Sequence, residues 1–246
     1  EADDPQLLAI QQRFADLEIE AGNLERARVL ATDVLRAAER AYGTHSEESR
    51  RACYQLGDIR RRQGDLHQAD SLFARSIATA PLGKDRDTDA VLHLALQGRA
   101  EVRMATQRWS EAITDLRDAR AITIHTYDTM HHAVAQADLK LAEAQLGAGH
   151  PQAAMVHVQE ARRIVQDRAA ALRKALVPQT FPAPQLLSDA LYWKVVIERK
   201  LSGNTFNPEW NADLDTAILA LERNKTTLDD ETGKLIPLDV KAGNRV

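Results

Sequence analysis

Small and apolar residues recur along this chain at the spacing of an α-helix, in paired segments separated by short polar breaks. The clearest pair occupies residues 49–63 and 66–80, with a break at Gly64-Asp65 and a stop at Pro81. The residues that share a face are Ala52, Cys53, Leu56, Gly57 and Ile59 in the first segment, and Ala69, Leu72, Phe73, Ser76 and Ile77 in the second. The pattern predicts two antiparallel amphipathic helices that cross at Gly57 and Ala69, where a larger side chain would overpack the contact.

The break between the two helices carries a signature that recurs at a nearly fixed period. A glycine stands five residues before an alanine at Gly22…Ala27, Gly64…Ala69 and Gly149…Ala154, while the third copy reads Gln107…Ala112, so that the steps are 42, 43 and 42 residues. Such a period is typical of stacked supersecondary units. We therefore expect an all-α, right-handed solenoid of four helical hairpins, near residues 5–42, 47–81, 89–125 and 132–176. Because Gln107 replaces the glycine, we expect a less sharply bent third turn.

The pattern changes beyond residue 176. Residues 177–184 contain three prolines and predict a linker. Helices near 185–202 and 208–223 follow, and this C-terminal helix pair, 185–224, fits the capping role that the end of a repeat array requires. Residues 225–246 are polar and contain glycines and a proline, which predicts an irregular tail.

The composition narrows the class of protein. Of the 246 residues, 28% are charged and only 4% are aromatic, which favours closely stacked helices over a globule built around large rings. The formal charge of −4 offers no general attraction to nucleic acid or to an anionic membrane. The chain begins with Glu1 rather than methionine, so we expect a processed protein or an excised segment. Cytoplasmic and periplasmic locations both stay open.

The residue order of the second hairpin resembles the tetratricopeptide repeat (TPR), whose pattern is matched by Leu56-Gly57, Gly64, Ala69, Phe73 and Pro81. The usual TPR period is 34 residues, and the longer period here is similar to the variant of kinesin light chains and of many bacterial signalling proteins. The segments 42–46 and 127–131 resemble the Gly-x-x-His-Pro linker of that variant without its proline. The resemblance covers residues 5–176. HEAT or armadillo units, with periods of about 40–47 residues, are the structural alternative.

Three features could carry chemistry, and each has a simpler interpretation. The run Asp85–Asp89 resembles the start of a calcium loop but lacks its central glycine and closing glutamate, which favours an acidic helix entry. Three nearby histidines lack the cysteines and the helical spacing of a zinc site, namely His125, His131 and His132. Cys53 lies on the apolar face without a partner base. We predict no metal, no cofactor and no catalytic residue.

One acidic position recurs on the first helix of every hairpin. Asp16, Asp58, Glu101 and Glu143 each directly follow the small residue of the helix crossing. The TPR resemblance implies that this position faces a concave groove where partner peptides lie. The same stripe and its flanks supply the other candidate groove residues: Gln12, Tyr54, Gln55, Arg61, Arg62, Gln97, Met104 and Lys140. An equally good interpretation is a solvated helix face, with Arg62 placed to pair with Asp58.

Taken with the resemblance, these patterns predict a non-catalytic scaffold that binds a protein or peptide. The acidic column favours a partner with a basic segment, and the resemblance implies the sensory or docking part of a bacterial signalling protein. The groove lacks the Lys and Asn of the family's carboxylate clamp, so a C-terminal acidic peptide is not expected. A ligand-gated regulator that binds a small molecule or signal peptide, and a secreted or periplasmic assembly factor, are the alternatives. No nucleic acid and no membrane insertion of this segment are expected.

Overall fold

The computed structural model describes residues 5–81, 89–174, 183–203, 207–216, 226–228 and 235–237. The chain forms two compact units, Glu1–Asp128 and Thr129–Val246. Apart from two strands of three residues each, the regular elements of the described part are helices. The prediction of an all-α array of helical hairpins is confirmed.

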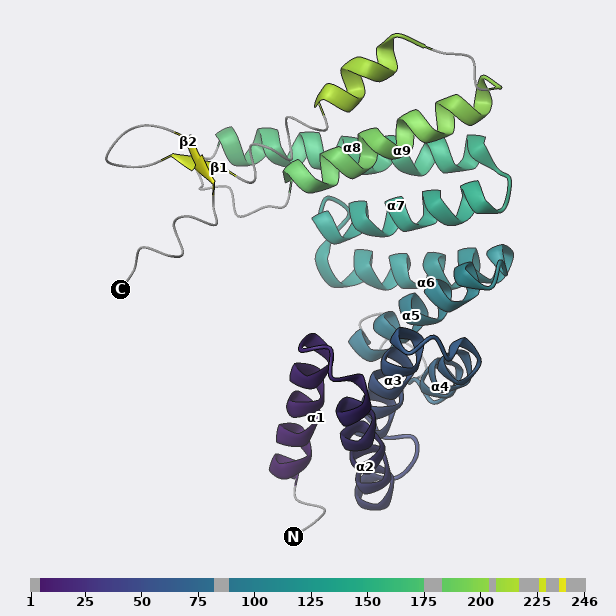
Figure 1. Ribbon diagram of the computed structural model, residues 1–246, viewed down its shortest axis with the longest axis vertical. Coiled ribbons are helices and arrows are strands. Elements are labelled where there is room, and N and C mark those ends of the chain that lie inside the picture. The colour runs from purple at the N-terminus through teal and green to yellow at the C-terminus, as the bar shows by residue number, and fades with distance from the viewer. Residues whose placement is uncertain are drawn as a thin grey trace. The chain divides into compact units, whose positions relative to one another are not determined.

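The first unit consists of three consecutive hairpins (Figure 1). Each helix packs against the next one along the chain, and the first helices of the hairpins also contact one another, α1 with α3 and α3 with α5. The helices are α1 (Pro5–Glu20), α2 (Leu24–Tyr42), α3 (Glu47–Arg62), α4 (Leu66–Ala78), α5 (Ala90–Ala105) and α6 (Trp109–Tyr127). The first helices therefore share one side of this unit, which we call the first-helix face.

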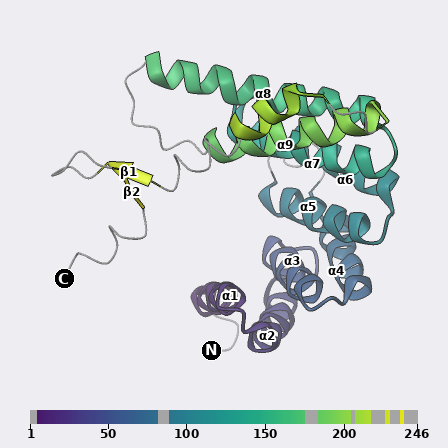
Figure 2. The same ribbon diagram turned by 45° about the horizontal axis from the view of Figure 1, so that its top comes forward.

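The second unit contains the fourth hairpin and a helix that covers it (Figure 2). Helix α9 packs on both α7 and α8. The helices are α7 (His132–Gly147), α8 (Pro151–Lys174) and α9 (Ala183–Leu201). Residues 209–216 form a further helical segment, whose Trp210 Nε1 donates to Glu198 of α9 at 3.0 Å. Helix α9 thus covers the last hairpin, and the segment 209–216 contacts α9 in turn.

Several boundaries in the second unit bear on the sequence predictions. The linker 177–184 lies outside the described residues except for its last two, where α9 begins at Ala183. The second half of the predicted helix 208–223 lies outside them as well. Where the sequence predicted an irregular tail, the described residues form an antiparallel strand pair, β1 (Thr226–Leu228) with β2 (Leu235–Pro237).

All four hairpin turns have the same backbone conformation. Gly22, Gly64 and Gly149 have φ angles of 77°, 82° and 82°, and Gln107 has a φ angle of 59°. The N–H of Gln107 donates to the carbonyl of Met104 at 3.0 Å, and the next N–H donates to the carbonyl of Arg103 at 2.7 Å. The same two bonds close the glycine turns, which is the Schellman geometry. The expectation of a less bent third turn is wrong, because these bonds hold glutamine in the left-handed region despite its steric cost.

Phe73 of α4 is the central side chain of the packing between the second and third hairpins. It is fully buried, and its ring lies between Gly57 of α3 and Gly98 of α5. A Cβ atom added to Gly57 would lie 2.9 Å from the ring, and one added to Gly98 would lie 2.5 Å from it. Two glycines on neighbouring first helices therefore make room for one phenyl ring.

Candidate functional site

The first-helix face carries the acidic column in the first unit. Asp16 of α1 is exposed, and the carboxylates of Asp58 on α3 and Glu101 on α5 are partly exposed. The fourth member, Glu143, is exposed on α7 in the second unit, where Lys140 is partly buried. The three residues of the first unit lie on helices that contact one another in sequence, so this unit alone presents a continuous candidate surface.

Two arginines on α3 pair with the acids of this column. Arg61 Nη2 lies 2.6 Å from Asp58 Oδ1, and Arg62 Nε lies 2.8 Å from the other carboxylate oxygen. Arg61 also reaches the next hairpin, where its Nη1 lies 3.2 Å from Glu101 Oε2. The column is therefore a partly exposed ion-pair cluster rather than a bare acidic stripe. The pair between hairpins could not be seen in the i+4 spacing of one helix.

Gln55 connects the first two hairpins beneath the column. Its side chain is buried, and its Nε2 donates both to the backbone carbonyl of Gln12 at 2.8 Å and to Asp16 Oδ1 at 2.6 Å. Gln55 is thus a contact between α1 and α3 rather than an exposed residue. Because its N–H groups fix the Asp16 carboxylate, that acid is held in place on the face.

Tyr54 supplies a large, partly buried side chain between the charged groups. Its ring centroid lies 6.0 Å from that of Phe73. Burial raises the pKa of Tyr54 to about 12, and the neighbouring Asp58 adds to this shift. The phenol therefore stays protonated and can donate a hydrogen bond at neutral pH. Gln97 and Met104 of α5 are also partly buried, so the face combines charged, amide and apolar groups.

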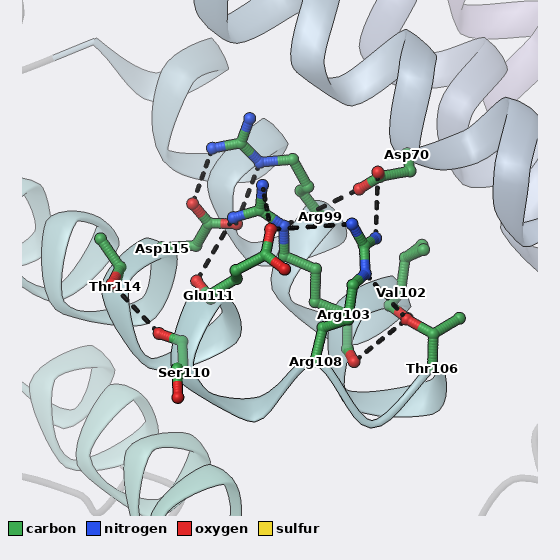
Figure 3. A network of polar contacts seen from close by, with 10 residues as sticks. All are labelled: Asp70, Arg99, Val102, Arg103, Thr106, Arg108, Ser110, Glu111, Thr114 and Asp115. Carbon is green, nitrogen blue, oxygen red and sulfur yellow. Dashed lines mark hydrogen bonds and ion pairs between the residues drawn. The ribbon is translucent and has the colours of Figure 1, made fainter.

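A larger ion-pair network joins α4, α5 and α6, and sequence analysis did not identify it (Figure 3). Asp115 has a side chain that is only 3% exposed, and it accepts hydrogen bonds from Arg99 at 2.7 and 3.0 Å and from Arg103 at 2.7 Å. Arg108 lies 3.0 Å from Asp70 of α4. The four-residue spacing of Arg99 and Arg103, which places both on one face of α5, was the sequence signal that could have identified this network. Glu111, which lies 3.3 Å from Arg103, is the third acid of this network. Three acids and three arginines thus balance in charge, which indicates a structural role.

Two further residues that the sequence analysis considered for chemistry, Asp89 and Cys53, are buried. Asp89 caps α5 by accepting from the Leu92 N–H at 2.8 Å, and it pairs with buried Arg50 at 2.7 Å. The remainder of the candidate calcium loop lies outside the described residues. Burial raises the pKa of Cys53 to about 11. Within the described residues, no group of three His, Cys, Asp or Glu side chains is placed to hold a metal ion.

The fold is that of TPR-like repeat proteins, as comparison with solved structures shows. A kinesin light chain protein from Podosopora anserina with nearly identical TPR-like repeats is 16% identical, with a TM-score of 0.66 over 90% of this chain and 98% of that one. BtubC (BKLC) from P. vanneervenii is 16% identical, with a TM-score of 0.71 over 85% of this chain and 78% of that one.

A third similar structure is YrrB, described as a TPR protein with an unusual peptide-binding site. It is 15% identical, with a TM-score of 0.51 over 87% of this chain and 90% of its own. No family model matches the chain, and no curated protein matches it. The likeness therefore establishes the fold.

Proposed function

We propose that the chain is a non-catalytic scaffold that binds a peptide segment of another protein on the first-helix face of its first unit. The observation that carries this proposal is the partly exposed cluster of Asp58, Arg61 and Glu101, which continues across two neighbouring hairpins. The Arg61–Glu101 pair is the more open of the two, with side chains 29% and 34% exposed, and ion pairs that water reaches contribute at most about 1 kcal/mol to stability. Such groups can exchange partners at little cost.

The chemistry of the face favours a partner segment that contains lysine or arginine. Asp16, Asp58 and Glu101 place three carboxylates there, and Arg61 is shared between Asp58 and Glu101. A cation from the partner can therefore replace Arg61 at one of its two carboxylates. Tyr54 offers a ring and a hydroxyl donor beside them. The role of a docking part in a bacterial signalling protein rests on the sequence resemblance and stays a proposal.

Two cavities among the described residues of the first unit do not favour the small-molecule alternative. One has a volume of about 590 Å³ but is lined by four charged residues of α2, Asp33, Arg36, Glu39 and Arg40. Another, near the start of α1, measures about 210 Å³. A small-molecule sensor would need an enclosed and mainly apolar pocket.

None of the helices that the structure describes has the length and apolar character to span a bilayer.

Two substitutions with opposite expected effects test the peptide proposal. Binding of labelled basic peptides would be measured by fluorescence anisotropy at low salt. We expect Glu101→Lys to weaken binding several-fold, and we expect Arg61→Gln to strengthen it because the competing cation is gone. Both effects should shrink as salt is raised.

Asp33→Lys is the matched control, because it makes the same change of charge at an exposed position of α2. It should leave peptide affinity unchanged. If Glu101→Lys and Asp33→Lys reduce affinity equally, only the net charge of the protein matters, and the first-helix face is not the binding site.

A further inference from the structure

Tyr54 and Gln97 place hydrogen-bonding groups on the first-helix face that the protein itself leaves unused. Among the described residues, neither the Tyr54 hydroxyl nor the Gln97 carboxamide has a hydrogen-bond partner. Both side chains are only partly buried, and their polar atoms reach the surface. A hydroxyl and an amide are both able to donate to a carbonyl oxygen, so two donors on this face are open to a ligand.

The two residues hold equivalent places on neighbouring first helices. Tyr54 stands four residues before Asp58 on α3, and Gln97 stands four residues before Glu101 on α5. Four residues are about one helical turn, so the donor and the acid share a stripe of each helix, roughly 6 Å apart along its axis. Asp58 is close enough to raise the pKa of the Tyr54 hydroxyl. Each hairpin thus presents the same pair, a neutral donor and a carboxylate.

The distance between the two pairs is set by the packing of α3 on α5. These helices are in contact, and the ring of Phe73 lies between a glycine of each. The axes of packed helices stand about 8–10 Å apart. Arg61 of α3 reaches the acids of both helices, Asp58 and Glu101. Groups of a ligand that meet the two pairs must therefore repeat at about 8–10 Å.

Among the regular backbone conformations, polyproline II matches this repeat. It has three residues per turn and rises about 3.1 Å per residue, so residues three positions apart point the same way at about 9.3 Å. Side chains of a β-strand point the same way every second residue, at about 6.6 Å or 13 Å. An α-helix uses its carbonyls for its own hydrogen bonds, whereas polyproline II leaves them free to accept from Tyr54 and Gln97.

We infer that the first-helix face binds a polyproline II segment of another protein that carries lysine or arginine at every third position. Two basic side chains of this segment meet Asp58 and Glu101, and two of its backbone carbonyls accept from Tyr54 and Gln97. This inference rests on the proposed function, because it names the conformation and the sequence pattern of the partner. It needs only α3 and α5, and each of these packs between two other helices of the first unit.

The test uses the whole chain and labelled proline-rich peptides of equal length and composition, with both ends blocked. The peptides differ only in the spacing of two lysines, which stand two, three or four positions apart. In fluorescence anisotropy at low salt, we expect the spacing of three to bind about fivefold more tightly than the other two. Only this spacing turns both ammonium groups toward the protein, and one further partly exposed ion pair accounts for a difference of about that size.

Two substitutions test the donors. Tyr54→Phe removes the hydroxyl and keeps the ring beside Phe73. It should weaken binding of the peptide with spacing three by about fivefold, the usual effect of one lost hydrogen bond. Its melting temperature should match that of the wild type, because the hydroxyl has no partner among the described residues. Gln97→Met should act in the same way. The control Tyr192→Phe makes the same change at an exposed position of α9 and should bind like the wild type.

An alanine-rich helical peptide with lysines three positions apart is the control for conformation. It should bind more weakly than the proline-rich peptide, because its carbonyls are already bonded within the helix.

The outcomes separate this inference from the proposed function. If all three spacings bind equally and Glu101→Lys weakens them all, the inference is wrong and the proposed function stands. Equal binding of the helical and the proline-rich peptides would also overturn the inference. Unchanged binding by Tyr54→Phe and Gln97→Met would remove the carbonyl contacts on which the choice of polyproline II depends. If no basic peptide binds the wild type, the proposed function fails and the inference fails with it.

Discussion

Replacing Gly98 by alanine should destabilise the first unit, although alanine is the better helix former. The added Cβ would lie 2.5 Å from Phe73 Cζ and 2.7 Å from Cε1. The ring has little room to move away, because its other side lies so close to Gly57 that a Cβ added there would stand 2.9 Å from it. Overpacking of this kind costs about 1–3 kcal/mol, whereas helix propensity returns about 1 kcal/mol. The expected net loss of stability is therefore up to about 2 kcal/mol.

The assay is urea unfolding followed by circular dichroism, and the sign of the change is diagnostic. In an uncrowded helix, Gly→Ala raises stability. The background variant Phe73→Leu removes the obstructing ring atoms, so in that background Gly98→Ala should become neutral or stabilising. If Gly98→Ala destabilises equally in both backgrounds, the clash with the ring is not its cause. If Gly98→Ala stabilises the wild type, the packing argument itself is refuted.

Three further predictions concern strain, buried charge and pH. Gln107→Gly should raise the free energy of unfolding by about 1 kcal/mol, because glutamine occupies a left-handed conformation at φ 59°; thermal melting checks this, and an unchanged or lower melting temperature would contradict it. Asp115→Asn should cost about 3 kcal/mol in urea unfolding, since it removes the buried negative charge that Arg99 and Arg103 share, and a loss below 1 kcal/mol would refute that role. Burial lowers the pKa of His93, so the unfolded chain binds the proton more tightly. Stability should therefore fall as the pH drops below about 6.5, and His93→Gln should flatten this dependence between pH 7 and 5.

The periodic signals in the sequence predicted the hairpins well, because turns and helix crossings are local events. Gly64 and Ala69 have the turn conformation and the burial that their types suggest. Gln107 shows the limit of this reasoning, since hydrogen bonds to two preceding carbonyls impose a conformation that its side chain disfavours. Gly98 was not identified as a crossing residue, because its role depends on a phenyl ring from another hairpin.

The candidate site was harder to predict than the fold. The acidic column follows from the repeat, yet the partners of its members do not. Arg61 and Glu101 are 40 positions apart, and Gln55 and Asp16 are 39 apart. Which long side chain bends toward which neighbouring helix is decided by packing between hairpins. The burial of Gln55 has the same origin, whereas the pairing of Arg99 and Arg103 with Asp115 is decided by packing between the two helices of the third hairpin.

The network around Asp115 has a consequence for how this array comes apart. Solenoids tend to unfold from their ends, one repeat at a time, because each repeat contacts only its neighbours. Here Asp70 of the second hairpin is tied to Arg108 of the third, and Arg103 connects Asp115 with Glu111 within that same cluster. Opening the third hairpin would strip the buried Asp115 of its arginine partners, and separating it from the second hairpin would break the Asp70–Arg108 pair as well. Amide hydrogens of α4, α5 and α6 should therefore exchange through one shared unfolding reaction. Those of α1 should exchange through a separate unfolding reaction that involves fewer residues and occurs more often.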